Sequence, residues 1–195
     1  EDPWTYHYQY ENNAVGLSGS ELASYAPPEC VFTDEGIAIP NTDEFVRYGE
    51  CDITIALDPA GRSTRSSVRT SQTAMAIVAR DVHGRKFITG RKGYVKTTQW
   101  LDWVFGEAEF YGEALARTVI EEAAGFAALD SIIIREQYIR NIRLKYRPTP
   151  ALGDKILTIK TILQPELDHG MIYVDQRLLP QFMDELKAFP NGYAM

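Results

Sequence analysis

The sequence contains little cysteine and little histidine. Its 195 residues include two cysteines, Cys30 and Cys51, and three histidines, His7, His83 and His169. So few residues argue against a disulfide framework and against a zinc site with closely spaced Cys and His ligands. Long apolar runs are also missing, since no stretch reaches the roughly 18 residues that a membrane-spanning helix requires. We therefore expect an intracellular protein without a membrane span.

The composition is that of a folded protein. Apolar residues make up 45% of the chain and aromatic residues 11%, which argues against disorder and is enough for one substantial core. The length does not allow two full enzyme domains. We expect the main domain over residues 51–195. Residues 1–50 are acidic and have short apolar runs, so we expect a peripheral, linker-like segment without a core of its own.

Charge is distributed unevenly along the chain. The formal net charge is −7, yet residues 1–57 hold eleven Asp/Glu and one Arg, whereas residues 58–195 hold nineteen Lys/Arg and sixteen Asp/Glu. Residues 62–98 contain nine bases and one acid, and a second basic stretch covers 135–160. Such charges often only solvate a surface. Two basic stretches that flank isolated carboxylates nevertheless favour an anionic polymer as substrate, because Lys and Arg make most phosphate contacts.

Hydrophobic periodicity predicts an α/β fold with a mixed sheet. Alternating apolar residues predict a buried strand over 52–58, and the turn Asp81–Gly84 between two apolar segments predicts a hairpin. A buried face at helical spacing predicts a helix that Thr97 or Thr98 would N-cap. The remaining expected elements are strands over 118–121, 138–146 and 170–174, and helices over 123–134, 155–163 and 178–189. Three strands followed by mixed helices and strands are typical of layered α/β architecture.

Two of the expected strands end in acid. Asp58 follows Leu57, and Glu121 and Glu122 follow Ile120. A carboxylate beside apolar residues is costly to bury unless something positive compensates it, and Mg²⁺ or Mn²⁺ would do so. Two such ions about 4 Å apart support phosphodiester hydrolysis. An N-cap or a solvated strand end is the alternative for each acid.

The order of these segments resembles the C-terminal nuclease domain of tailed-bacteriophage terminase large subunits. The similarity is carried by Cys51–Ala60, by Thr73–Asp81 and its hairpin, and by Val119–Gly125. It continues through residues 155–190, and Tyr8–Asn13 is similar to the segment that follows the motor domain in these proteins. The resemblance implies a ribonuclease H-like fold with a mixed central sheet flanked by helices. It also implies a metal-dependent endonuclease (a hydrolase) that cleaves concatemeric viral DNA during genome packaging in the host cell cytoplasm.

The resemblance assigns roles to particular residues. Asp58 corresponds to the acid on the first strand and Glu121 to the acid that ends the later strand, with Glu122 as the competing choice. These residues would hold two Mg²⁺ or Mn²⁺ ions, with Asp58 and Glu121 as catalytic groups. The implied partners are double-stranded DNA, the portal protein and the small terminase subunit. The bases expected to contact DNA are Arg62, Arg65, Arg69, Arg85, Lys86, Arg91 and Lys92.

Two departures from the family pattern qualify this interpretation. A third acid of the family is expected just beyond Met195, and neither Asp175 nor Asp184 matches its position. No GxxxxGK[ST] phosphate loop is present, so we expect no ATP hydrolysis from this chain. Two alternatives stay open: another ribonuclease H-like enzyme, such as a junction resolvase or transposase-like strand transferase, and a non-catalytic module that docks on DNA or the portal.

Overall fold

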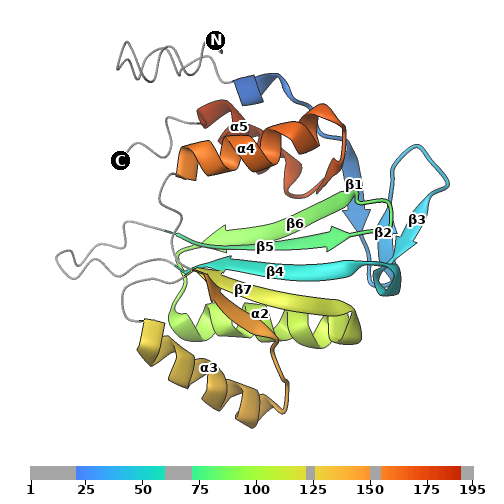
Figure 1. Cartoon of the computed structure of the whole chain (residues 1–195). Helices are drawn as coiled ribbons and strands as arrows, with labels where there is room; N and C mark the ends of the chain where they lie inside the picture. Colours follow the sequence, from blue (N-terminus) through green and yellow to red (C-terminus); the bar gives the residue numbers. More distant parts are fainter. Residues whose placement is uncertain (1–20, 60–71, 122–125, 150–154, 190–195) are drawn as a thin grey trace, which may run out of the picture.

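The strands form one mixed β-sheet. The structure is a computed structural model of the chain and describes residues 21–59, 72–121, 126–149 and 155–189 (Figure 1). Across the sheet the strands follow the order β3-β2-β1-β9-β6-β5-β4-β7-β8. Their bounds are β1 Glu29–Phe32, β2 Gly36–Ala38, β3 Phe45–Arg47, β4 Asp52–Asp58, β5 Thr73–Arg80, β6 Lys86–Gly93, β7 Leu115–Glu121, β8 Tyr146–Thr149 and β9 Ile172–Asp175.

Helices lie on both sides of this sheet. Four α-helices and three short 3₁₀ helices are described: α2 Thr97–Tyr111, α3 Phe126–Arg140, α4 Lys155–Asp168, α5 Leu179–Ala188, η3 Glu21–Ser24, η4 Tyr48–Glu50 and η5 Gly112–Ala114. Figure 1 shows α2 below β7, and α4 and α5 beside β6. None of the helices in the described ranges is long and apolar enough to cross a membrane. The expected α/β class with a mixed sheet is confirmed.

The centre of the sheet is an antiparallel meander of β4, β5 and β6. The pairs run from Asp52↔Arg80 to Asp58↔Ala74 between β4 and β5, and the hairpin β5–β6 confirms the expected turn at Asp81–Gly84. Asp81 stabilises this turn by accepting hydrogen bonds from the backbone N–H groups of His83 and Arg85, both at 2.9 Å. Gly84 has φ +83°, a backbone conformation that glycine adopts without steric cost.

Burial distinguishes the two faces of the meander. Ile53, Ile55 and Leu57 are buried in one core cluster together with the inward side of α2. The buried α2 residues are Trp100, Leu101, Val104, Phe105, Ala108 and Tyr111. A second cluster joins α4 and α5 to Ile172 and Val174 of β9. Because side chains alternate along a strand, Thr54, Ala56 and Asp58 lie on the face opposite α2.

The directions of the strands place several strand ends at one edge of the sheet. β7 is parallel to β4, and β8 is parallel to β7. β6 runs in the same direction, since β5 is antiparallel to both β4 and β6. The carboxyl ends of β4, β6, β7 and β8 therefore share an edge. In open α/β sheets this is the edge at which ligands bind.

The structure differs from the expectations at several elements. Residues before 51 are not merely peripheral, since β1, β2 and β3 extend the sheet and Cys30 and Ile37 are fully buried in the main core. The edge strand expected over 138–146 is β8 at 146–149, because α3 continues to Arg140 and ends where Asn141 adopts φ +54°. The N-cap of α2 is Lys96 rather than a threonine, and its N–H donates to Gln99 Oε1 at 2.9 Å.

Candidate metal and nucleic-acid site

The structure brings the two predicted acids together. Leu57 of β4 and Ile120 of β7 are Cα partners in a parallel pair. Asp58 and Glu121 are the next residue of each strand, so they lie side by side at the carboxyl edge, about 5 Å apart in backbone position. Both point away from the buried face of Leu57 and Ile120. Asp58 is exposed and Glu121 is half-buried.

These carboxylates fit a divalent cation by their chemistry. They are hard oxygen donors at adjacent positions, and one or two carboxylates with water and phosphate oxygens are the usual environment of Mg²⁺. Within the described ranges no three His, Cys, Asp or Glu side chains converge as a metal-binding group. Glu122, the competing acid, lies outside the described residues. The pair Asp58 and Glu121 is therefore what the structure offers as ligands.

Asp175 and Asp184, which do not match the family's third acid in the sequence, do not adjoin Asp58 and Glu121 in the strand pairing. Asp175 ends β9 and is fully buried. It accepts hydrogen bonds from Thr89 Oγ1 at 2.8 Å and from Arg177 Nη2 at 2.6 Å. These hydrogen bonds outweigh the effect of burial and hold the pKa of Asp175 below its usual value. Asp184 lies on α5 and is exposed, as expected for a solvated residue.

The four hairpin bases predicted to contact DNA are all bound to carboxylates. Arg85, 17% exposed, donates from Nε to Asp81 Oδ2 at 2.7 Å and also pairs with Glu44. Lys86 pairs with Glu166, Arg91 with Glu107, and Lys92 with Glu185 at 2.7 Å. Lys92 pairs in register with Ala74, which in turn pairs with Asp58, so Lys92 lies on the face of the acids. Arg62, Arg65 and Arg69 lie outside the described residues.

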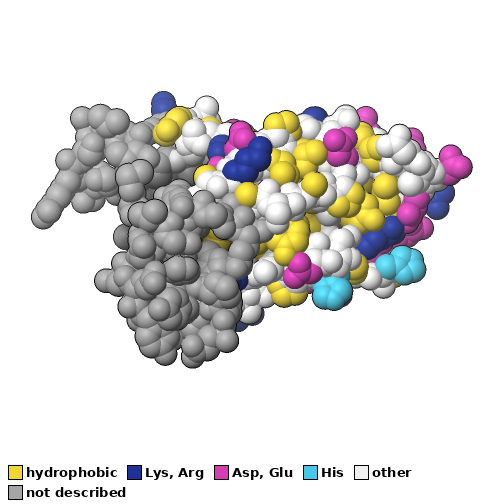
Figure 2. All heavy atoms as spheres, turned by 90° about the horizontal axis from the view of Figure 1, so that it is seen from above, with side chains coloured by type: hydrophobic (Ala, Val, Ile, Leu, Met, Phe, Trp, Pro, Cys, Tyr) yellow, Lys and Arg dark blue, Asp and Glu magenta, His cyan; other side chains and the backbone are white. Residues whose placement is uncertain are grey.

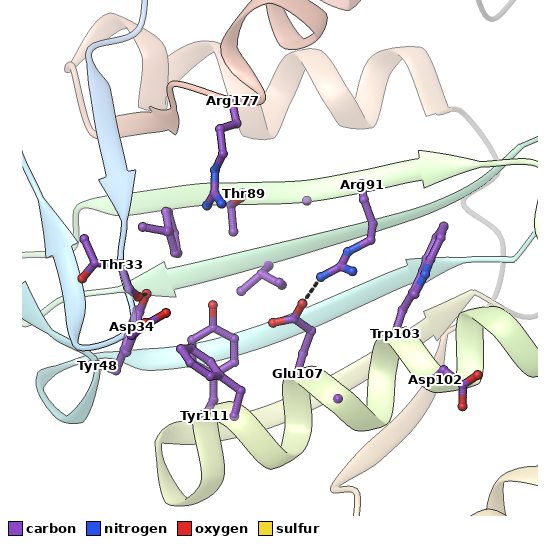
Figure 3. Close-up of a pocket in the computed structure, with 15 residues that line it drawn as sticks. Thr33, Asp34, Tyr48, Thr89, Arg91, Asp102, Trp103, Glu107, Tyr111 and Arg177 are labelled. Atoms are coloured by element: carbon purple, nitrogen blue, oxygen red, sulfur yellow. Dashed lines mark hydrogen bonds and ion pairs between the residues drawn. The ribbon is translucent and has the colours of Figure 1, made fainter.

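Arg91 lies on the opposite face, beside a large pocket. Its Cα partner is Met75, which is buried on the α2 side. The pocket has a volume of about 670 Å³ and is lined by strand and loop residues and by the side of α2 that carries Glu107 and Tyr111 and faces the strands (Figure 3). Figure 3 shows Arg177 and Thr89 on the strand side of this pocket and Glu107 and Tyr111 on α2. Burial raises the pKa of Glu107, which the ion pair with Arg91 opposes. The pocket contains neither Asp58 nor Glu121.

The remaining cysteines and histidines do not add to the site. Both cysteines are free and buried, and burial, helped by the charge of Asp175, raises the pKa of Cys30 to about 12. His83 and His169 are exposed. Figure 2 shows histidine side chains at the rim, away from the undescribed segments, on a face where acidic and basic side chains are mixed. No continuous basic patch is visible in that view.

Two bases near the acid pair are absent from the DNA-contact residues predicted from the sequence. Arg117 precedes Glu121 by four residues in β7, so the two share a face. Arg147 of β8 is the Cα partner of Val119, which lies on that same face. A period-2 spacing with Glu121 is the signal that finds Arg117, but Arg147 is found only through the pairing of β8 with β7. The sequence matches no protein-family model and no curated protein.

Proposed function

We propose that this protein is a metal-dependent DNA endonuclease with a ribonuclease H-like fold. The observation that carries the proposal is the adjacency of Asp58 and Glu121 at the ends of parallel neighbours β4 and β7. They are 63 positions apart in the sequence, and no local pattern requires them to meet. The strand order β6-β5-β4-β7-β8, antiparallel in its first three strands and parallel in its last three, is compatible with that fold.

The residues of the site have distinct roles in this proposal. Asp58 and Glu121 would hold the ions through their carboxylate oxygens. Bound there, two Mg²⁺ or Mn²⁺ ions would supply the chemistry of phosphodiester hydrolysis, which is activation of a water and stabilisation of the leaving oxygen. Asp58 is exposed and thus accessible to a backbone phosphate, and Glu121 is half-buried. The proposed substrate is double-stranded DNA, and concatemeric viral DNA is the form that the family resemblance indicates.

Plasmid cleavage with Mn²⁺ tests this function. Asp58→Asn should reduce the cleavage rate at least about 100-fold, which corresponds to about 2.7 kcal/mol of transition-state stabilisation. Glu121→Gln should have a similar effect. Asp52→Asn is the matched control, because Asp52 begins the same strand, faces the same side and is exposed. Cleavage by Asp58→Asn at the rate of the Asp52→Asn control would refute the proposal.

A non-catalytic docking module is the second candidate. It is favoured by the absence of a three-ligand metal group among the residues that the structure describes. Isothermal titration with Mn²⁺ separates the two functions. The endonuclease requires Mn²⁺ binding that Asp58→Asn abolishes, whereas a docking module would bind no Mn²⁺ through Asp58.

A further inference from the structure

The hairpin bases and the two arginines near the acid pair differ in their partners. In the hairpin, Arg85, Lys86, Arg91 and Lys92 each form an ion pair with a carboxylate. Arg117 instead donates from Nε to the hydroxyl of Thr54 at 3.2 Å. Neither Arg117 nor Arg147 forms an ion pair with any residue that the structure describes, and both are exposed. Positive charge that no described carboxylate neutralises is therefore present on the β7–β8 side of the acid pair.

Register places these two arginines close to the acids and on their face. Thr54 is the Cα partner of Arg117, and Val119 is the Cα partner of both Ala56 and Arg147. Arg147 is one strand across and two residues back from Glu121, which corresponds to about 8 Å of backbone separation. Arg117 lies in the same strand as Glu121, about 13 Å back along it. The hydrogen bond to Thr54 confirms that the Arg117 side chain lies over β4 on this face.

We infer that Arg117 and Arg147 bind the phosphate backbone of the DNA strand that reaches the Asp58–Glu121 site. This inference rests on the proposed function and specifies the side of the acid pair on which the strand lies. A guanidinium forms charge-assisted hydrogen bonds with phosphate oxygens and needs no particular base. The two arginines thus position the backbone across β7 and β8. The hairpin bases contribute less, since each is already neutralised by a carboxylate.

DNA binding in EDTA tests the inference without any cleavage. The double variant Arg117→Gln/Arg147→Gln should bind a short fluorescein-labelled duplex about tenfold more weakly, as fluorescence anisotropy measures. Between about 50 and 200 mM salt, the slope of log K against log salt should fall by about 1.8, because two phosphate contacts are lost. The conservative double variant Arg117→Lys/Arg147→Lys should keep that slope, which a purely structural role of the arginines would not predict.

The matched control removes two other exposed arginines. Arg47 pairs with Glu50 at 3.7 Å and Arg80 with Asp52 at 3.8 Å, so Arg47→Gln/Arg80→Gln changes the net charge equally. Its affinity should stay within about twofold of wild type. Wild-type affinity and salt slope in Arg117→Gln/Arg147→Gln, or an equal loss in the control, would overturn the inference. If that happened while Asp58→Asn still lost cleavage, the proposed nuclease function would stand and only the DNA-binding role of the two arginines would fail. If instead Arg117→Gln/Arg147→Gln weakened binding while Asp58→Asn cleaved normally, the DNA-binding role would stand and the nuclease function would fail.

Discussion

Replacing Arg177 by methionine should destabilise the protein by about 2 kcal/mol. Asp175 is fully buried, and its Oδ2 accepts hydrogen bonds from Arg177 Nε at 3.1 Å and from Arg177 Nη2 at 2.6 Å. Leaving a buried charge without its partner costs about 3–5 kcal/mol. The cost is smaller here because Thr89 and the backbone N–H of Arg177 still donate to Asp175. The Arg177 side chain is also 67% exposed, so water can replace some of the hydrogen bonds that its guanidinium donates to Asp175.

The pH dependence gives a second signature of the same interaction. Burial raises the pKa of Asp175, but the hydrogen bonds from Arg177 and Thr89 outweigh burial and lower it overall. A carboxyl with a lowered folded-state pKa stabilises the fold above its unfolded value of about 3.9. That stabilisation is lost as the pH falls through the folded pKa. Removing the guanidinium lets burial raise the folded pKa of Asp175, so Arg177→Met should lose less stability on acidification than wild type, and the stability difference between the two should shrink as the pH falls through the folded pKa.

Urea unfolding over a series of pH values measures both effects. At neutral pH the loss of about 2 kcal/mol corresponds to a fall in Tm of about 4–8 °C for a chain of this size. Arg47→Met is the matched control, since Arg47 is 75% exposed and its ion pair with Glu50 spans 3.7 Å. It should cost less than about 0.5 kcal/mol. If Arg177→Met costs no more than Arg47→Met, the argument from the buried charge of Asp175 is refuted.

Three further predictions concern the metal site, the hairpin turn and the pocket. Mn²⁺ at about 100 times its Kd should stabilise the wild type by about 2.7 kcal/mol. Thermal unfolding should show this gain in Asp52→Asn and not in Asp58→Asn. Asp81→Asn should cost about 1–3 kcal/mol in urea unfolding, because buried Asp81 accepts from two backbone N–H groups and from Arg85 Nε. Burial raises the pKa of Glu107, so its contribution to stability is present at acid pH and is lost as the pH rises through the folded pKa. Glu107→Gln should remove this contribution to the pH dependence of stability. If urea unfolding gave Glu107→Gln the same dependence of stability on pH as wild type, the prediction would be contradicted.

Local patterns predicted the centre of the sheet. The alternation of Ile53, Ile55 and Leu57 identifies β4, and the turn residues Asp81–Gly84 identify the hairpin, because each signal lies within a few residues of its consequence. Helical periodicity identified α2 in the same way. The three strands before residue 48 were missed, since each has only three or four residues. They are stabilised by pairing in the sheet, where β1 pairs with β9 and β2 and β3 are added next to β1, rather than by a pattern of their own.

Tertiary contacts decided the elements that the sequence placed incorrectly. The β-branched run Ile132–Ile134 weakens a helix locally, yet α3 continues through it because Ile133 is fully buried in the main core. β8 contains Pro148, which cannot donate a ladder hydrogen bond and is tolerated because β8 is an edge strand. Neither the extent of α3 nor the position of the edge can be obtained without knowing what each segment packs against.

The electrostatic effect of a base also depends on tertiary contacts that the sequence does not show. The sequence shows nine bases and one acid between residues 62 and 98, which suggests a strongly positive hairpin. In the structure the neutralising carboxylates come from other elements: Glu44 between β2 and β3, Glu107 on α2, Glu166 on α4 and Glu185 on α5. An exposed ion pair contributes little stability, but it cancels the field that would attract a phosphate. A base without such a partner therefore counts for more in binding than its neighbours, and for this reason Arg117 and Arg147 outweigh the hairpin beside the acid pair.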